Sequence, residues 1–305
     1  MDASNPSSLP LPPLMREGGE LAPAAVAALC EHPRFAAAMR ALLADNVRLY
    51  RGNRILNYVG YDRGRLIVGI LALYLYVTRR DDDPGSGLTA QRLKALCVEQ
   101  DVCSAGRARA MLSLLQLFGY IERAPAADGR YKQLAPTPLL TSFLRERWSA
   151  MLGATALVLP EVAAARTALA REDFLAALVR GVIDQFRTGI RTLAITPALR
   201  PFAEHNAGLM ILSSLALAGA DDDTMPPSAP VRMSISELAR RFSVSRTHVL
   251  RLFRDAGAHG LIERGTAGQE TITFTPVLSD ALRKSVAMLF LFFAHCGRTA
   301  LAETK

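Results

Sequence analysis

The chain repeats a long pattern of its own, and this internal repeat restricts the fold more than any other feature of the sequence. Three pairs of landmarks are 139 residues apart: Phe35 and Phe174, Asp45 and Asp184, and Arg48 and Arg187. Further pairs follow in the same order at nearly the same offset: "DDD" at 81–83 and 221–223, "GYIER" at 119–123 and "GLIER" at 260–264, and "TPLLTSFLR" from Thr137 and "TPVLSDALR" from Thr275. A repeat of this length predicts two copies of one domain, because solenoid repeats span only about 20 to 50 residues.

The size of the chain agrees with two domains, since 305 residues of which 50% are hydrophobic can bury a substantial core. We expect a first unit at 21–159 and a second at 160–298. Residues 1–20 are rich in Pro, Ser and Gly and lack the basic start and apolar core of a secretory signal, so a disordered tail is expected there. Residues 299–305 are expected to form a short C-terminal tail.

Each unit predicts the same order of elements. An amphipathic helix comes first, near 35–47 and 175–186, followed by a more uniformly apolar helix, at about 207–218 in the second unit. Next comes an acidic loop, formed by the "DDD" run of each unit, and then a short extended segment that leads to a capped helix. In the second unit, Ser234 and Glu237 are expected to form a capping box at the start of this helix. A turn then leads to another helix, whose N-cap is Ser245 and whose buried stripe is expected to consist of Val249, Leu252, Phe253 and Ala256.

Two alternating segments, "LIER" and "TITFT", close the second unit and predict a hairpin around "GTAGQE". The first unit repeats this with the helix "SAGRARAMLSLLQLF" and a hairpin through "APAADGRYKQ". The predicted fold class is mainly α with small β-wings (α+β). It consists of two tandem winged helix-turn-helix units in a pseudo-two-fold arrangement.

The segment "LARRFSVSRTHVLRLFRDAGAHGLIER" resembles the winged helix-turn-helix of bacterial transcription regulators such as the GntR family. The order of elements around it is similar to the MarR family, in which flanking helices form a dimer. The resemblance implies that Arg246, Thr247 and Arg251 read bases. The sequence departs from it at Leu250, where GntR-type proteins often carry arginine, and in the first unit, where "SAGRA" replaces "SRTHV".

Basic charge coincides with the two motifs. Residues 232–264 contain seven arginines and three acidic residues, and residues 88–133 contain seven basic and four acidic residues, so the motifs hold +7 of the net +8. An arginine on an exposed helix face is often only solvated, but the coincidence in both units favours nucleic-acid binding. The candidate DNA-binding residues are Ser245, Arg246, Thr247, His248, Arg251 and Arg254 in the second unit, and Ser104, Arg107, Arg109, Arg130 and Lys132 in the first. Ser245 and Arg254 are expected on phosphates, and for His248 a plain polar role is an equal alternative.

Other functional classes have little support. The five histidines show no catalytic or metal-binding spacing and no glycine-rich phosphate loop is present, so we expect neither an enzyme nor a metal or cofactor. The aspartate runs are expected to be solvated turns, with cation binding as the alternative. The four cysteines are expected to be reduced thiols of a cytoplasmic protein. Oxidation of Cys97 and Cys103, which bracket a turn, is the alternative.

The apolar segments 66–77 and 286–296 are too short to cross a membrane and predict buried helices. Trp148 and three tyrosines, Tyr50, Tyr58 and Tyr61, are expected in the core, and an effector pocket is the alternative for them. A small-molecule effector therefore stays among the partner classes.

The sequence thus predicts a sequence-specific regulator of transcription that binds double-stranded DNA through two recognition helices in one chain. Packing of 137–159 against 275–296 would make it a monomeric pseudo-dimer, with a homodimer as the alternative. Two other functions remain open: a plasmid-type replication initiator, and a tandem winged-helix protein-interaction module of a chromosome-maintenance complex.

Overall fold

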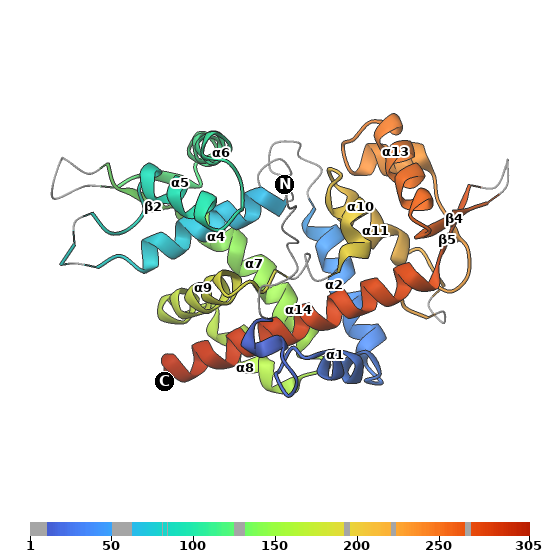
Figure 1. The fold of residues 1–305 in the computed structure, drawn as a ribbon, viewed down its shortest axis with the longest axis horizontal. Coiled ribbons are helices and arrows are strands. Elements are labelled where there is room, and N and C mark those ends of the chain that lie inside the picture. Colours follow the sequence, from blue (N-terminus) through green and yellow to red (C-terminus); the bar gives the residue numbers. More distant parts are fainter. Residues whose placement is uncertain are drawn as a thin grey trace, which may run out of the picture.

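The computed structural model describes residues 11–50, 63–80, 82–83, 85–124, 132–191, 196–220, 224–265 and 270–305, with nothing said of the side chains of 63–65. The chain is mainly helical with small antiparallel sheets, which agrees with the α+β class. Two lobes stand on a common base (Figure 1). The first lobe contains α4, α5, α6 and the β1–β2 hairpin, the second lobe contains α10 to α13 and β3 to β5, and the base contains α1, α2, α7, α8, α9 and α14.

The first half of the chain has these elements in order: η1 (Pro13–Met15), α1 (Pro23–Cys30), α2 (Phe35–Leu49), α4 (Arg63–Val77), α5 (Ala90–Glu99), α6 (Ala105–Leu117), β1 (Ile121–Arg123), β2 (Leu134–Pro136) and α7 (Pro138–Thr155). The second half has η2 (Pro160–Val162), α8 (Ala163–Ala168), α9 (Glu172–Arg187), η3 (Pro197–Leu199), α10 (Arg200–Ala203), α11 (Gly208–Ala216), β3 (Val231–Arg232), α12 (Ile235–Arg241), α13 (Arg246–Ala258), β4 (Ile262–Arg264), β5 (Thr271–Phe274) and α14 (Pro276–Glu303). The expected helices and hairpins are therefore present, and α14 continues through 299–303, where a tail was expected.

Local signals in the sequence explain where α13 begins and which face it buries. The Ser245 hydroxyl accepts a hydrogen bond from the backbone N–H of His248 at 3.1 Å, as expected of an N-cap. The predicted stripe is fully buried, with all four side chains at 0% exposure: Val249, Leu252, Phe253 and Ala256. At the start of α12 the Ser234 hydroxyl likewise accepts from the Glu237 N–H at 3.3 Å. The apolar period and the caps thus set the orientation of both helices.

The two halves build the same junction between the second helix, the hairpin and the long helix that follows. Gly119 and Gly260 adopt positive φ, +72° and +65°, which a side chain would disfavour. The hydroxyl of Thr137 donates to Gly119 O at 2.6 Å, and the hydroxyl of Thr275 donates to Gly260 O at 2.8 Å. The repeated letters "GYIER" and "GLIER" therefore mark one local structure that occurs twice.

The sheets differ between the lobes. β1 pairs antiparallel with β2, and in the second lobe β5 pairs with both β4 and β3. The expected extended segment before the capped helix is a strand only in the second lobe. In the described part of the first lobe, the segment at this place makes one backbone hydrogen bond to the hairpin, from Leu134 N to Leu88 O at 2.9 Å. One such bond is not enough to define a strand.

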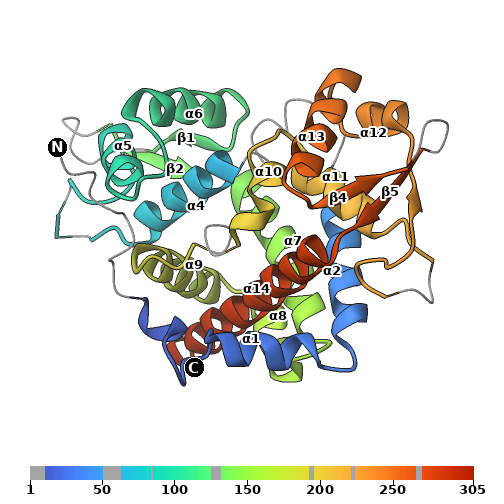
Figure 2. The same cartoon turned by 45° about the vertical axis from the view of Figure 1, so that its right-hand side comes forward.

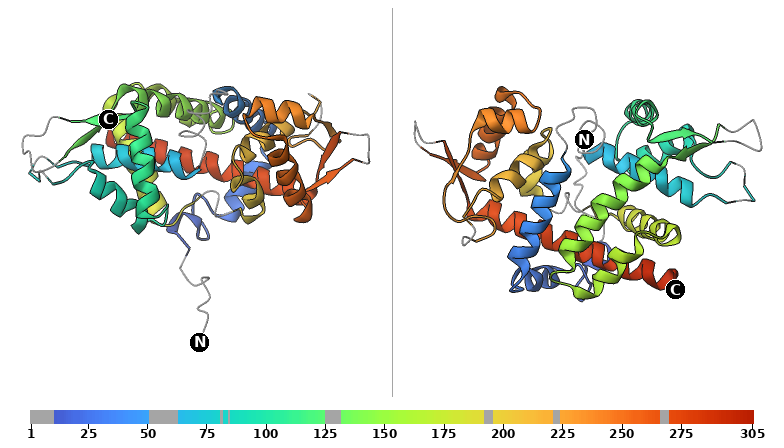
Figure 3. Two further views of the ribbon diagram at one scale, coloured as in Figure 1. Left: turned by 90° about the horizontal axis from the view of Figure 1, so that it is seen from above. Right: turned by 180° about the vertical axis from the view of Figure 1, so that it is seen from behind.

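The halves are packed through each other. Helix α2 of the first half contacts α7 of its own half and α11 of the second lobe, whereas α9 of the second half contacts α14 of its own half and α4 of the first lobe. The base helices α7 and α14 also contact each other, and the view from behind shows them crossing (Figure 3). Both views in this figure show the two hairpins at opposite ends of the molecule. Each half therefore supplies a helix that covers the lobe of the other half.

Two hydrogen bonds fasten these exchanged helices. Tyr50, which follows α2, donates its buried hydroxyl to Phe242 O at 2.7 Å, and the two rings pack edge to face. Arg191, which follows α9, donates to Gln100 O. Phe242 and Gln100 are the C-caps of α12 and α5, so each lobe is held at the same point of its turn by the opposite half. We call these contacts the Tyr50 clasp and the Arg191 clasp.

Helix α14 runs beneath both lobes (Figure 2). Within the described residues it alone has the length and hydropathy of a membrane span, yet 56% of its most apolar window is buried inside the protein, as in a core helix. Residues 286–296 provide most of that burial, including Phe290, Phe292 and Phe293. Trp148 of α7 packs edge to face on Phe293. The crossing of α7 and α14 is therefore the centre of the apolar core.

Candidate nucleic-acid interface

Helix α13 presents one polar face opposite its buried stripe. Arg246, Thr247 and Arg251 are all exposed, and Leu250 between them is 40% exposed. No hydrogen bond or ion pair with another described residue is shown for the side chains of Arg246, Thr247 or Arg251. Two guanidinium groups and a hydroxyl thus point outward from one helix face, in the pattern that can contact the edges of base pairs.

The residues expected on phosphates flank this face. Ser245 is exposed, and because its hydroxyl only accepts from the His248 N–H, its proton is free to be donated to an anion. Arg254 is exposed, and its Nε lies 3.5 Å from Oδ1 of the neighbouring Asp255. An exposed pair of this kind adds little stability and can exchange its acidic partner for a phosphate.

His248 faces the protein. Its Nε2 lies 2.9 Å from Asn206 O, and its ring packs edge to face on His205 with centroids 5.5 Å apart. His205 in turn lies 3.3 Å from Asp255 through Nε2 and 2.7 Å from Pro201 O through Nδ1. Burial, followed by the charges of His205 and Arg251, lowers the pKa of His248 against the opposing hydrogen bond to Asn206 O. The histidine anchors α13 to the segment between α10 and α11.

Helix α6 has the same start as α13 but a different outward face. Ser104 caps it by accepting from the Arg107 N–H at 3.3 Å, as Ser245 caps α13. Counting from these caps, Arg107 and Arg109 take the positions of His248 and Leu250. Ala105, Gly106 and Ala110 take the positions of Arg246, Thr247 and Arg251. The first lobe therefore exposes two arginines but no long side chain at the three positions that form the polar face of α13.

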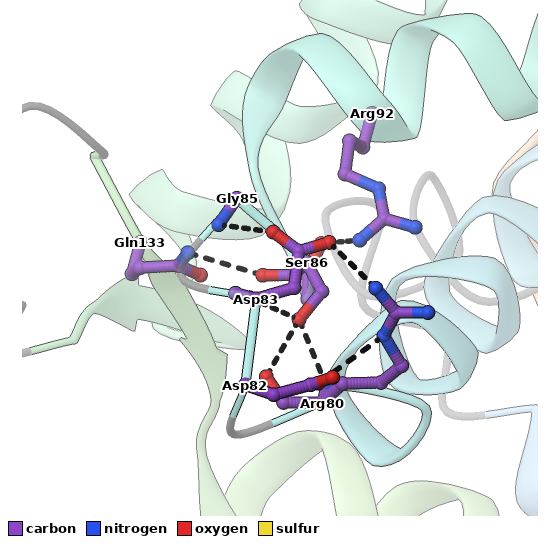
Figure 4. A network of polar contacts seen from close by, with 8 residues as sticks. Arg80, Asp82, Asp83, Gly85, Ser86, Arg92 and Gln133 are labelled. Carbon is purple, nitrogen blue, oxygen red and sulfur yellow. Dashed lines mark hydrogen bonds and ion pairs between the residues drawn. The ribbon is translucent and has the colours of Figure 1, made fainter.

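The hairpin of the first lobe is fixed at its base. Arg130 lies outside the described residues, whereas Lys132 is described and exposed. Next to it the buried Gln133 donates to Ser86 O at 3.1 Å (Figure 4). Ser86 itself donates to Arg80 O at 2.9 Å and accepts from the Arg80 N–H at 2.9 Å. This network connects the acidic loop to the segment that leads from Lys132 into β2.

The acidic loop uses its described carboxylates internally. Asp82 and Asp83 lie 3.5 Å and 3.3 Å from the guanidinium of Arg80. Asp81 and the second aspartate run, 221–223, lie outside the described residues. Among the residues that the structure does describe, no group of three or more His, Cys, Asp or Glu is placed to hold a metal ion.

Two exposed arginines were missing from the sequence-based set. Arg123 ends β1 and Arg264 ends β4, and both side chains are exposed at the start of their hairpins. They are the last residues of the repeated segments "GYIER" and "GLIER", so their recurrence in both units was the sequence feature that could have identified them as candidates. Both belong to the basic surface of their lobe.

The candidates for an effector pocket are distributed differently. Trp148 and Tyr50 are buried in ring contacts, with Phe293 and Phe242 respectively, and Tyr58 and Tyr61 lie outside the described residues. These contacts agree with the core role expected for Trp148 and Tyr50.

Helices α6 and α13 lie on the same side of the molecule, one on each lobe, above the crossing of α7 and α14 (Figures 1 and 2). Comparison with known proteins adds no relative, since no family model, no curated protein and no solved structure matches this chain.

Proposed function

We propose that the chain is a transcription regulator that binds double-stranded DNA in a sequence-specific manner, through two winged helix-turn-helix units arranged as a pseudo-dimer within one chain. The observation that carries the proposal is the polar face of α13, where Arg246, Thr247 and Arg251 are exposed on the side opposite a fully buried stripe. The resemblance of this segment to the GntR family and the MarR-like order of elements point to the same function.

The chemistry of this face fits duplex DNA. The major groove is wide enough to admit an α-helix, and an arginine fork matches the O6 and N7 acceptors of guanine. Exposed basic side chains at the hairpins, Lys132, Arg123 and Arg264, would neutralise phosphates together with Arg254 on α13. A second capped helix, α6, lies on the same side of the molecule and would supply a second groove contact without a second subunit.

The two halves of the bound site should differ in this proposal. Helix α13 carries base-reading chemistry, whereas α6 offers Arg107 and Arg109 at other positions and small residues where α13 has Arg246, Thr247 and Arg251. The first lobe would therefore contact the backbone more than the bases. Selection of bound duplexes from a random pool should return one defined half-site beside a degenerate one, whereas a palindrome would contradict this assignment.

The first test is the salt dependence of binding to duplex DNA. About six neutralised phosphates would lower log affinity with log salt at a slope of about −0.9 for each phosphate. Arg34→Ala is the control variant, because it removes one positive charge at an exposed residue of the base, between α1 and α2 and away from the proposed interface. It should leave the slope unchanged. A flat salt dependence would remove the proposal and favour a protein-interaction module. A defined site that occurs as repeats at replication origins would favour a replication initiator.

A further inference from the structure

The turn between α5 and α6 contains two cysteines in contact with each other. Cys97, in the last turns of α5, is fully buried, whereas Cys103, directly before the N-cap of α6, is partly exposed. The backbone N–H of Cys103 lies 3.5 Å from Cys97 O, and the neighbouring Cys103 contributes to a raised pKa of the Cys97 thiol. The two residues thus lie side by side in the turn.

The second lobe builds the same turn without sulfur. Asp101 and Ser243 both adopt positive φ, +49° and +52°. The Val102 N–H donates to Cys97 O at 2.9 Å, and the Val244 N–H donates to Ala239 O at 3.0 Å. Alanine therefore replaces Cys97 in an equivalent turn.

Cys103 has no counterpart in the second lobe. In that lobe the N-cap Ser245 follows Val244 directly, whereas Cys103 is inserted between Val102 and the N-cap Ser104. Since the turn folds with alanine in one place and no residue in the other, its backbone requires neither thiol.

We propose that Cys97 and Cys103 are a redox-sensitive disulfide site whose oxidant is a hydroperoxide. The partly exposed Cys103 reacts first: its sulfur attacks the hydroperoxide, the O–O bond breaks, and a sulfenic acid forms with release of alcohol or water. The Cys97 sulfur then attacks that of Cys103. The S–S bond forms, the S–O bond breaks, and the hydroxyl leaves as water with the Cys97 proton.

Burial, followed by the neighbouring Cys103, raises the pKa of Cys97 to about 12, which suits the order of these steps. Cys97 stays protonated and unreactive toward oxidant, and acts only on a sulfur already in contact with it. Since the thiolate is the attacking species, the closing step should accelerate as the pH rises.

Closing the bond would move α6. A disulfide needs an S–S distance of about 2.05 Å, which is shorter than any contact between two thiols that are not bonded. Cys97 is fixed in the buried face of α5, so Cys103 must shift, and the N-cap Ser104 is bonded directly to it. Oxidation should therefore displace α6 against α5 and leave α13 in place.

The test treats the full chain with hydrogen peroxide, blocks free thiols with an alkylating reagent and digests with trypsin. Peptide 95–107 carries both cysteines, because no lysine or arginine lies between Lys94 and Arg107. We expect this peptide two hydrogens lighter and without alkyl groups, and dithiothreitol should restore two alkylated thiols. Sulfinic or sulfonic acid on Cys103 beside an alkylated Cys97, or two thiols that remain free, would overturn the proposal.

Two variants and a second readout complete the test. Cys103→Ser should abolish the loss of two hydrogens, whereas Cys30→Ala, which removes a thiol beside α14, should leave it unchanged. Hydrogen exchange should rise on oxidation at the start of α6 and stay constant in α13. These measurements do not depend on DNA, so their failure would leave the proposed function intact, and a chain that ignores DNA could still form the disulfide.

Discussion

The first and second lobes make matching hydrogen bonds between side-chain hydroxyls and the backbone around their second helix, but they present different side chains to solvent. In both, a serine caps the helix, a glycine of positive φ ends it, and a threonine closes the hairpin. The second lobe adds Arg246, Thr247 and Arg251 on the outer face of α13, and the first adds Cys103 to its turn. The caps, the glycine and the threonine occur in both lobes and so belong to the shared fold, whereas the side chains that occur in only one lobe are those on which the proposals above depend.

The largest effect on stability should come from separating the two halves, by expressing residues 1–159 and 160–305 as separate chains. Each fragment would lose the helix that the other half packs against its lobe. The first fragment would lose α9, which contacts α4, and the second would lose α2, which contacts α11. Burial of a large apolar side chain contributes about 1.5–3 kcal/mol. The free energy lost by exposing several of them should therefore exceed the free energy of unfolding of a typical domain, about 5–15 kcal/mol. Urea unfolding by circular dichroism should show no cooperative transition for either fragment, and recovery on mixing. Two fragments that each unfold cooperatively would contradict the exchange of helices.

Next in size is the difference between α13 and α6 on DNA. Arg246→Ala and Arg251→Ala should each cost about 1–3 kcal/mol on the selected site and relax its sequence preference, because each would remove a proposed base contact. Arg107→Ala and Arg109→Ala should weaken selected and random duplexes alike. Binding titrations with both duplexes measure the ratio. Equal loss from α6 and α13 variants on the selected site would show that both helices read bases.

Much of this could be predicted from the sequence because it is local. Helix periods, serine caps, the buried stripe of α13 and both hairpins depend on neighbouring residues, and they agree with the structure. The exchange of α2 and α9 was not predicted, since a contact such as that of Tyr50 with Phe242, 192 residues apart, has no local signal. The inward direction of His248 depends on Asn206 and His205, which come from another element. In the described part of the first lobe no strand precedes α5, whereas β3 precedes α12 in the second lobe. Whether such a segment becomes a strand depends on how many hydrogen bonds it makes with the distant hairpin, which its own residues do not reveal.

The two clasps allow a smaller test. Tyr50→Phe removes a buried hydroxyl and leaves Phe242 O without that donor, which should cost about 1–3 kcal/mol. Arg191→Gln, at a side chain that is 30% exposed, should cost less than about 1 kcal/mol, because water can replace the lost donor at Gln100 O. Urea midpoints of the full chain measure both. A larger loss from Arg191→Gln would mean that the first lobe depends more on its clasp than the second does.

The smallest expected effect concerns pH. Burial lowers the pKa of His248 in the folded chain, so the unfolded chain binds this proton at higher pH, near the ordinary value of about 6.5. The stability linked to His248 should therefore be present above about pH 6.5 and be lost as the pH falls below it. His248→Gln should reduce the fall in urea midpoint between pH 7.5 and 5.0. Arg107→Gln, at the matching position of α6, should leave it unchanged, and an equal change in both would exclude this assignment.

The joining of two similar halves in one chain also governs how the protein can evolve. In a dimer of identical chains every substitution occurs on both sides, whereas here a change in α6 leaves α13 as it was. That freedom ends where the halves are packed through each other: a change of volume in α2 must be matched in α11, and a change in α4 must be matched in α9. Outer faces can therefore diverge residue by residue, while the exchanged helices can change only in pairs drawn from opposite halves of the gene.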